Sequence, residues 1–231
     1  INVRKVLWLC DELGLEYERE DWGAGFRATD EPAFLRLNPN GLVPVLVDGD
    51  FVLWESNSIC RYLAAREQRL DLLPAAPRAR AGVEQWMDWQ ATDLNSAWRY
   101  AFMALVRRSA AHADAAAIAA SVEDWNRHMR RLDAQLAATG SYVTGATFTL
   151  ADIPLGLSTH RWLMAPIERP TLSAVEAYYE RLSQRAGFIR HGRNGLPCIP
   201  ARPRPFSFNV AGTTDIYALS LHDALPMSRP R

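Results

Sequence analysis

Two short segments, residues 38–46 and 53–58, carry groups that together can hold a peptide-like ligand. They read N-P-N-G-L-V-P-V-L and L-W-E-S-N-S. Pro44 stands where a strand should begin and lacks an N–H group, so the strand cannot be paired there on that side. Val43, held before this proline, can turn its N–H and C=O outward. The first segment therefore predicts a place where an extended peptide pairs with Val43 as a short added strand.

The second segment adds a place for the charged end of the same ligand. Glu55 and Ser56 stand at the expected start of a helix, which Ser56 can cap. Free backbone N–H groups and the positive end of the helix dipole favour a carboxylate there, while the Glu55 side chain can meet an ammonium group. One ligand with a peptide bond and a free α-amino-acid end would use both segments. The alternative is a plain strand start and helix cap.

Local patterns predict the elements that position these residues. Apolar spacing, a Gly14 stop, an alternating stretch and a hairpin flanking residues 48–50 indicate an α/β region. Asp30 is the expected N-cap of its second helix. The predicted order is helix, strand, helix, two strands and helix, within residues 3–13, 15–21, 31–37, 44–47, 51–54 and from 56 onward.

The remainder of the chain divides at a short proline-bounded stretch. Residues 74–77 read as a linker, and helical periodicity dominates after them. Long helices are expected over 86–105 and 118–136, a third from the T-L-A-D sequence at 149–152, and a last over 172–185. Asp152 is expected to be a structural cap, because T-x-x-D has capping-box spacing. We therefore expect an α/β domain, a linker, an all-α domain and a non-native or disordered tail, over residues 1–73, 74–77, 78–197 and 198–231.

Composition excludes several classes of function. The chain has 231 residues, with Lys plus Arg and Asp plus Glu equal at 26 each, so no global field attracts nucleic acid or an anionic membrane. Its apolar runs are too short to span a bilayer. Five scattered histidines and three cysteines show no metal-ligand spacing, so no metal is expected. The absence of a CxxC pair indicates a reduced, cytoplasmic protein, with Cys10 and Cys60 in the core.

The pattern N-P-x-G-x-V-P-x-L, followed by E-S at a helix start, resembles the glutathione transferases. The opening N-V-R-K-V-L-W at residues 2–8 is similar to the first helix of bacterial members related to the theta and nu classes, and T-L-A-D is similar to a cap in that family's helical domain. The similarity covers residues 2–197. It implies a thioredoxin-like N-terminal domain that lacks its first strand, followed by an all-α domain.

The resemblance also implies glutathione as co-substrate and a role for each residue of the two segments. Val43 would pair through its backbone with the cysteinyl part of glutathione, before a cis Pro44. Glu55 and Ser56 would hold the γ-glutamyl end, and Asn40 would lie near the glycyl carboxylate. These five residues form the expected glutathione-binding site.

The catalytic role falls to Asn2. In similar proteins a Ser or Thr hydroxyl stabilises the thiolate, and its position here immediately precedes Ile1. Asn2 resembles the amide that assists in nu-type relatives, although it is also a possible N-cap. The family's interior first strand would precede Ile1 too, so we expect unpaired ladder groups on its two neighbours. Leu42 departs from relatives with a polar residue there, and no side-chain hydrogen bond can be carried over to it.

Trp98, Arg99 and Phe102 are candidates for the electrophile site, although aromatic residues at helical spacing are also typical of a core. The preferred function is conjugation of the glutathione thiolate to hydrophobic small-molecule electrophiles. The alternatives are a nu-type glutathione-dependent reductase of disulfides or peroxides, and a non-catalytic dimerising module. The resemblance alone implies a homodimer.

Overall fold

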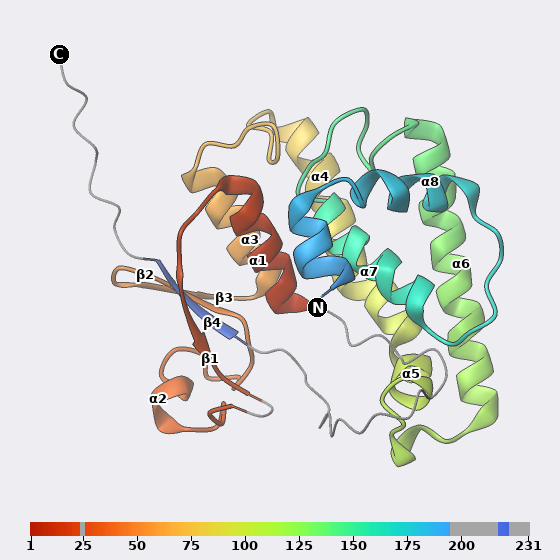
Figure 1. Cartoon of the computed structure of the whole chain (residues 1–231), viewed down its shortest axis with the longest axis horizontal. Coiled ribbons are helices and arrows are strands. Elements are labelled where there is room, and N and C mark those ends of the chain that lie inside the picture. The colour runs from red at the N-terminus through yellow and green to blue at the C-terminus, as the bar shows by residue number, and fades with distance from the viewer. Residues whose placement is uncertain (24–25, 195–216, 222–231) are drawn as a thin grey trace.

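The computed structural model describes residues 1–23 and 26–194, together with the backbone of residues 217–221. A small sheet with α1–α3 lies at one side, and α4–α8 form a helical layer at the other (Figure 1). The elements in chain order are α1 (Asn2–Leu13), β1 (Glu18–Asp21), α2 (Pro32–Leu35), β2 (Val45–Asp48), β3 (Phe51–Trp54), α3 (Ser56–Arg66), α4 (Pro77–Trp89), a π-helical segment (Gln90–Leu94), α5 (Asn95–Leu105), a 3-10 turn (Ala110–His112), α6 (Ala115–Thr139), α7 (Asp152–Met164), α8 (Ser173–Leu182), a second π-helical segment (Phe188–Arg193) and β4 (Tyr217–Leu221).

The sheet has the order β1-β4-β2-β3. β2 and β3 form the expected antiparallel hairpin, in which Val45 pairs with Trp54. β4 runs parallel to β2 and antiparallel to β1, and so fills the interior position between them. The expectation of unpaired ladder groups on β1 and β2 is therefore wrong, because open ladders of this kind accept another strand. Of the expected tail at 198–231, the structure describes only these five residues.

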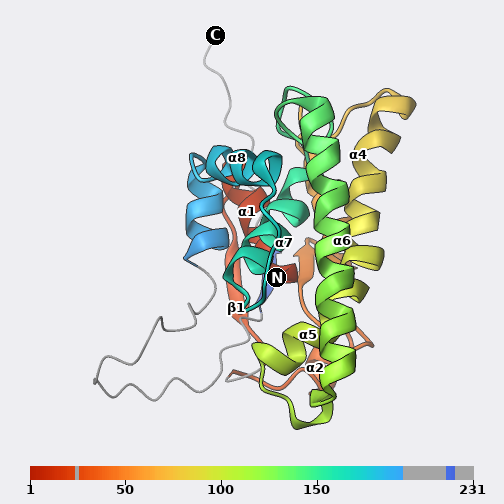
Figure 2. The same cartoon turned by 90° about the vertical axis from the view of Figure 1, so that its right-hand side faces the viewer.

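α1 is the most deeply enclosed helix of the N-terminal half. It packs against α3 on one side and against α7 and the segment Phe188–Arg193 on the other, an arrangement visible in Figures 1 and 2. Trp8 is fully buried, with ring centroids 5.7 Å from Phe148 and 5.0 Å from Phe188. A Cβ atom at Gly187 would lie 2.4 Å from Trp8 Cδ1, so only glycine permits this close approach.

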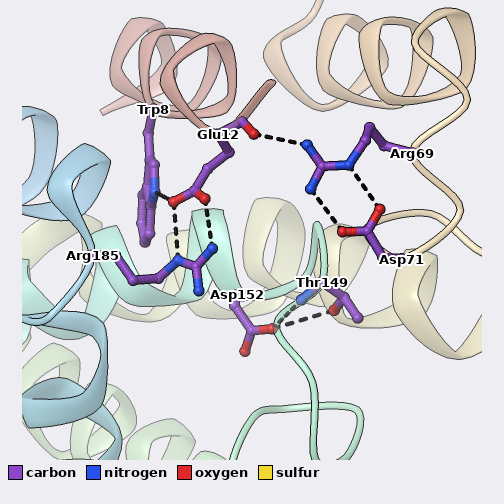
Figure 3. Close-up of polar contacts among 7 residues, drawn as sticks. All are labelled: Trp8, Glu12, Arg69, Asp71, Thr149, Asp152 and Arg185. Atoms are coloured by element: carbon purple, nitrogen blue, oxygen red, sulfur yellow. Dashed lines mark hydrogen bonds and ion pairs between the residues drawn. The ribbon is translucent and has the colours of Figure 1, made fainter. Parts of the chain in front are cut away.

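Glu12, near the end of α1, joins the two halves through charge-assisted hydrogen bonds (Figure 3). The guanidinium of Arg185 donates through Nε to Oε1 at 3.0 Å and through Nη2 to Oε2 at 2.5 Å. Trp8 Nε1 also donates to Oε1 at 2.8 Å, and Arg69 Nη1 donates to the Glu12 carbonyl at 2.8 Å. Bidentate pairing of this kind fixes orientation as well as distance.

Several element boundaries differ from the sequence predictions. The helix expected over 86–105 is instead α4 and α5 joined by the π-helical segment Gln90–Leu94. Buried Gln90 stabilises this π-helical segment, because its Nε2 donates to Asn95 Oδ1 and to Ser158 Oγ, each at 3.0 Å. The N-caps of α2 and α3 are Glu31 and Glu55, so neither Asp30 nor Ser56 is a cap. The final π-helical segment was not expected.

Asp152 is a buried structural centre rather than a simple cap. Its Oδ2 accepts from Thr149 N at 2.8 Å, the contact expected of a capping box, although the N-cap of α7 is Ala151 rather than Thr149. Its Oδ1 accepts from Val143 N at 3.0 Å and from the Tyr178 hydroxyl at 3.1 Å. Burial raises the pKa of this carboxyl to about 6, although all these hydrogen bonds oppose the shift. The two Cys residues expected in the core, Cys10 and Cys60, are both buried.

Among the described helices, none combines the length and the apolar character needed to traverse a bilayer.

Replacing Asp152 with Ala should lower the free energy of unfolding by about 3 kcal/mol or more, because two buried backbone N–H groups and one hydroxyl lose their acceptor. Urea denaturation checks this. Asp114→Ala is the matched control, since the exposed Asp114 side chain accepts from Ala117 N at the start of α6 and its loss should cost about 1 kcal/mol. Equal effects of the two substitutions would contradict the role given to Asp152.

Candidate functional site

The hairpin register brings the two sequence segments to the same end of the sheet. Because Val45 pairs with Trp54, the residues just before Val45 and just after Trp54 lie next to each other. These are Val43 and Pro44 on one side, and Glu55 and Ser56 on the other. The Val43–Pro44 peptide bond is cis. The structure thus places four of the five predicted glutathione-binding residues together.

The loop before Val43 is held by Asn38, a residue to which the sequence assigned no role. Asn38 is buried, and its Nδ2 donates to the Leu42 carbonyl at 2.6 Å. Its Oδ1 accepts from both the backbone N and the side-chain Nδ2 of Asn40, each at 3.0 Å. Gly41, with φ +62°, completes the turn. Asn40 itself is exposed at the loop surface, and Leu42 is 64% exposed.

The start of α3 offers backbone donors beside this loop. Glu55 adopts φ 73°, a left-handed conformation that costs a non-glycine residue about 1–3 kcal/mol and is typical of functional sites. Its carbonyl accepts from Ile59 N at 2.9 Å, the first intrahelical bond of α3. The N–H groups of residues 56–58 precede that bond, so they have no intrahelical acceptor. Ser56 is buried at this helix start, which suits it to a carboxylate. Glu55 is exposed, and its negative charge suits it to an ammonium group.

A buried lysine links the starts of α1 and α3. Lys5, 1% exposed, donates from Nζ to Asn57 Oδ1 at 3.2 Å. Asn57 Nδ2 in turn donates to the Met87 carbonyl of α4 at 2.9 Å. Burial lowers the pKa of Lys5 to about 8. These bonds fix the first turn of α3 relative to Asn2, three residues before Lys5.

A cavity of about 320 Å³ opens at the start of α1. It brings Asn2 together with two of the three residues predicted for the electrophile, Trp98 and Arg99. Phe102 does not line it but packs against Trp98 with ring centroids 5.2 Å apart. The full lining is Ile1, Asn2, Ala91, Asn95, Ser96, Trp98, Arg99 and Arg161. Arg161 is the residue that sequence reasoning missed; its signal was a charged residue inside an apolar helix.

A larger cavity, of about 530 Å³, lies at the opposite end of α1, around Cys10, Gly14 and Arg190. It contains none of the predicted site residues. Of these two cavities, the one at the start of α1 lies beside the predicted binding and catalytic residues. There a docking strand and helix donors for a peptide-like ligand lie on the α/β side, and a partly aromatic cavity lies on the helical side. Asn2 contributes to that cavity.

Comparison with known proteins identifies the family. The family described as the glutathione S-transferase N-terminal domain matches residues 2–66. Glutathione S-transferase GstB of Escherichia coli strain K12 is 37% identical over 186 residues, which cover 80% of this chain and 89% of GstB. The chain belongs to the glutathione S-transferase family. Glutathione S-transferase 3 of Zea mays is 33% identical over 213 residues, covering 89% and 93% of the two chains.

The solved structures agree with this assignment. The theta class glutathione S-transferase of Xanthomonas axonopodis pv. citri, with glutathione bound, superposes with a TM-score of 0.76 at 43% identity. The match covers 83% of this chain and 91% of that one. The predicted fold class, a thioredoxin-like domain followed by an all-α domain, is confirmed. Membership of this family makes the chain a transferase by descent.

The buried Lys5 predicts a pH dependence of stability. Its pKa of about 8 in the folded protein lies below the ordinary lysine value of 10.5, so between these two pH values the unfolded chain binds more protons than the folded one. The free energy of unfolding should therefore rise with pH from about 8 to about 10.5, by up to about 3 kcal/mol. Urea denaturation of the protein and of Lys5→Met, between about pH 7 and 10, checks this. If the free energy of unfolding of Lys5→Met rose with pH as steeply as that of the unmodified protein, the role given to Lys5 would be contradicted.

Proposed function

We propose that the protein conjugates the thiolate of glutathione to hydrophobic small-molecule electrophiles. The observation that carries this proposal is the juxtaposition at the start of α1. The hairpin end with Val43 and the helix start with Ser56 lie on the α/β side, and the cavity with Asn2 and Trp98 lies on the helical side. The Xanthomonas relative, 43% identical, holds glutathione, which supports the same ligand here.

Glutathione has the chemistry that the α/β side offers. Its cysteinyl peptide group pairs with the backbone of Val43 as an added strand. Its γ-glutamyl carboxylate accepts from the backbone and hydroxyl of Ser56 at the positive end of α3, and its ammonium meets Glu55. Its glycyl carboxylate lies near the amide of Asn40. Pro44 keeps the docking edge of Val43 free of a competing strand.

The catalytic step needs a thiolate, since a cysteine-type thiol with a pKa of about 8.5 is mostly protonated near neutrality. Asn2 and the N-terminus of α1 stabilise the anion by hydrogen bonding and by the helix dipole. The thiolate then attacks the electrophilic carbon of a substrate held against Trp98, Arg99 and Phe102. The protein supplies position and charge stabilisation, while glutathione supplies the nucleophile.

The domains divide these tasks between them. Residues 1–73 form the proposed glutathione-binding domain and residues 78–197 the proposed electrophile-binding domain, joined at 74–77. The family match over residues 2–66 and the start of α4 at Pro77 support this division. The relatives named above are transferases, so conjugation is proposed in preference to reduction or a non-catalytic role.

Ser56→Ala should weaken glutathione binding and raise the KM for glutathione by about tenfold, since a hydrogen bond to a charged group contributes about 1.5 kcal/mol. Initial rates with 1-chloro-2,4-dinitrobenzene at varied glutathione concentration measure it, and kcat should change little. Ser58→Ala removes a hydroxyl two residues further along α3 and is the control. An unmodified protein without conjugating activity would refute the function. Equal KM values in the two variants would refute the role of Ser56 alone.

A homodimer in the cytoplasm is the proposed state of the protein. β3 is an edge strand of the sheet. Its Phe51 and Trp54, which are 43% and 39% exposed, offer apolar surface against which a second chain can pack. Sedimentation equilibrium should give the mass of two chains, and Phe51→Glu should shift it toward one. A single-chain mass for the unmodified protein at high concentration would contradict the dimer.

A further inference from the structure

Arg161 is a buried cation, and the residues that the structure describes leave two of its guanidinium nitrogens without a hydrogen bond. It lies in α7 and is 6% exposed, yet its Nε and Nη1 make no hydrogen bond. Its guanidinium lies over the rings of Trp98, at 4.1 Å, and Phe102, at 4.5 Å. Stacking on aromatic rings offsets part of the cost of burying the charge. A buried cation without an ion-pair partner is nevertheless destabilising, so a negatively charged group placed against Arg161 would be strongly favoured.

The surroundings of Arg161 are positively charged. Burial, then Arg4 and Arg107, lower the pKa of Arg161 to about 9. Arg99 lines the same cavity. Within residues 1–23 and 26–194, no carboxylate forms an ion pair with Arg161, and the charges that act on it are those of Arg4 and Arg107. A bound anion would therefore relieve repulsion among these cations as well as satisfy the two free nitrogens.

The position of Arg161 identifies which ligand carries the anion. The start of α1 lies beside α7 in both views of the fold (Figures 1 and 2), and Arg161 shares the 320 Å³ cavity with Asn2. The groups proposed for the carboxylates and ammonium of glutathione lie on the hairpin end and the start of α3, and only its sulfur is placed at this cavity, beside Asn2. A cavity of this size takes a small aromatic molecule with one or two substituents. Trp98 supplies an apolar wall for the ring, and Arg161 supplies the charge.

We infer that the electrophile carries a carboxylate and that Arg161 binds it, so that the protein prefers anionic aromatic acceptors over neutral ones of the same shape. This inference rests on the proposed function and specifies its substrate class. A suitable probe is 4-chloro-3,5-dinitrobenzoate. The glutathione sulfur forms a bond to the ring carbon that bears chlorine, and chloride leaves with the electron pair of its bond. The thiol proton goes to solvent, and no oxidant or reductant is consumed.

The test compares this probe with 4-chloro-3,5-dinitrobenzamide, which has the same ring and leaving group but no charge. The unmodified protein should show a kcat/KM at least about tenfold higher for the benzoate, after correction for the uncatalysed rates. Arg161→Met should remove the preference by raising KM for the benzoate, while the benzamide changes less than about threefold. Arg161→Lys should restore part of it. Arg107→Met is the control, because it removes a nearby charge that does not line the cavity.

Three results would overturn the inference. One is equal kcat/KM values for the two probes in the unmodified protein. Another is an equal loss for both probes in Arg161→Met, which would indicate a structural or thiolate-stabilising role. A third is an Arg107→Met effect as large as that of Arg161→Met. Conjugation of the benzamide without a preference would refute this inference alone, whereas failure to conjugate either probe would refute the proposed function with it.

Inhibition of the unmodified protein gives a test that needs no folded variant. With 1-chloro-2,4-dinitrobenzene as substrate, 3,5-dinitrobenzoate should inhibit competitively at a concentration at least about tenfold lower than 3,5-dinitrobenzamide does. The difference should shrink at high salt, because the recognition is electrostatic. Equal inhibition constants would overturn the role of the carboxylate.

Discussion

The burial of α1 between α3 and α7 is the constraint on which the rest of the structure depends. Every residue from Val3 to Cys10 is buried, including Arg4 and Lys5. Enclosed polar groups must find partners inside the protein. Lys5 does so through Asn57, and near the end of the helix Glu12 does so through Arg185. The helix can therefore be enclosed only in one orientation, which leaves its start open.

That open start is where we propose that glutathione and the electrophile meet. The same burial that fixes α1 holds Asn2 at the edge of a cavity whose other walls come from α5 and α7. The Lys5–Asn57 bond sets the start of α3, with Glu55 and Ser56, beside it. The π-helical segment Gln90–Leu94 supplies Ala91 to the cavity wall, in keeping with the frequent use of such bulges at functional sites.

Local rules account for what the sequence could predict. Pro44 at a strand start and Glu55-Ser56 at a helix start act through neighbouring residues, so both could be predicted from the sequence. The hairpin register then brings them together. Contacts between segments far apart in the sequence could not be predicted in this way. Arg161 reaches Trp98 across more than sixty residues, and β4 enters the sheet from the far end of the chain. Nothing near either segment in the sequence specifies such contacts.

The proposed function requires that glutathione is bound with its sulfur as a thiolate at the start of α1. The most direct test is a spectroscopic titration of bound glutathione, following thiolate absorbance against pH, with the glutathione-free protein subtracted. Bound glutathione should titrate with a thiol pKa at least about one unit below the ordinary value of about 8.5. Glutathione that binds but titrates at its ordinary pKa would contradict thiolate stabilisation at the start of α1.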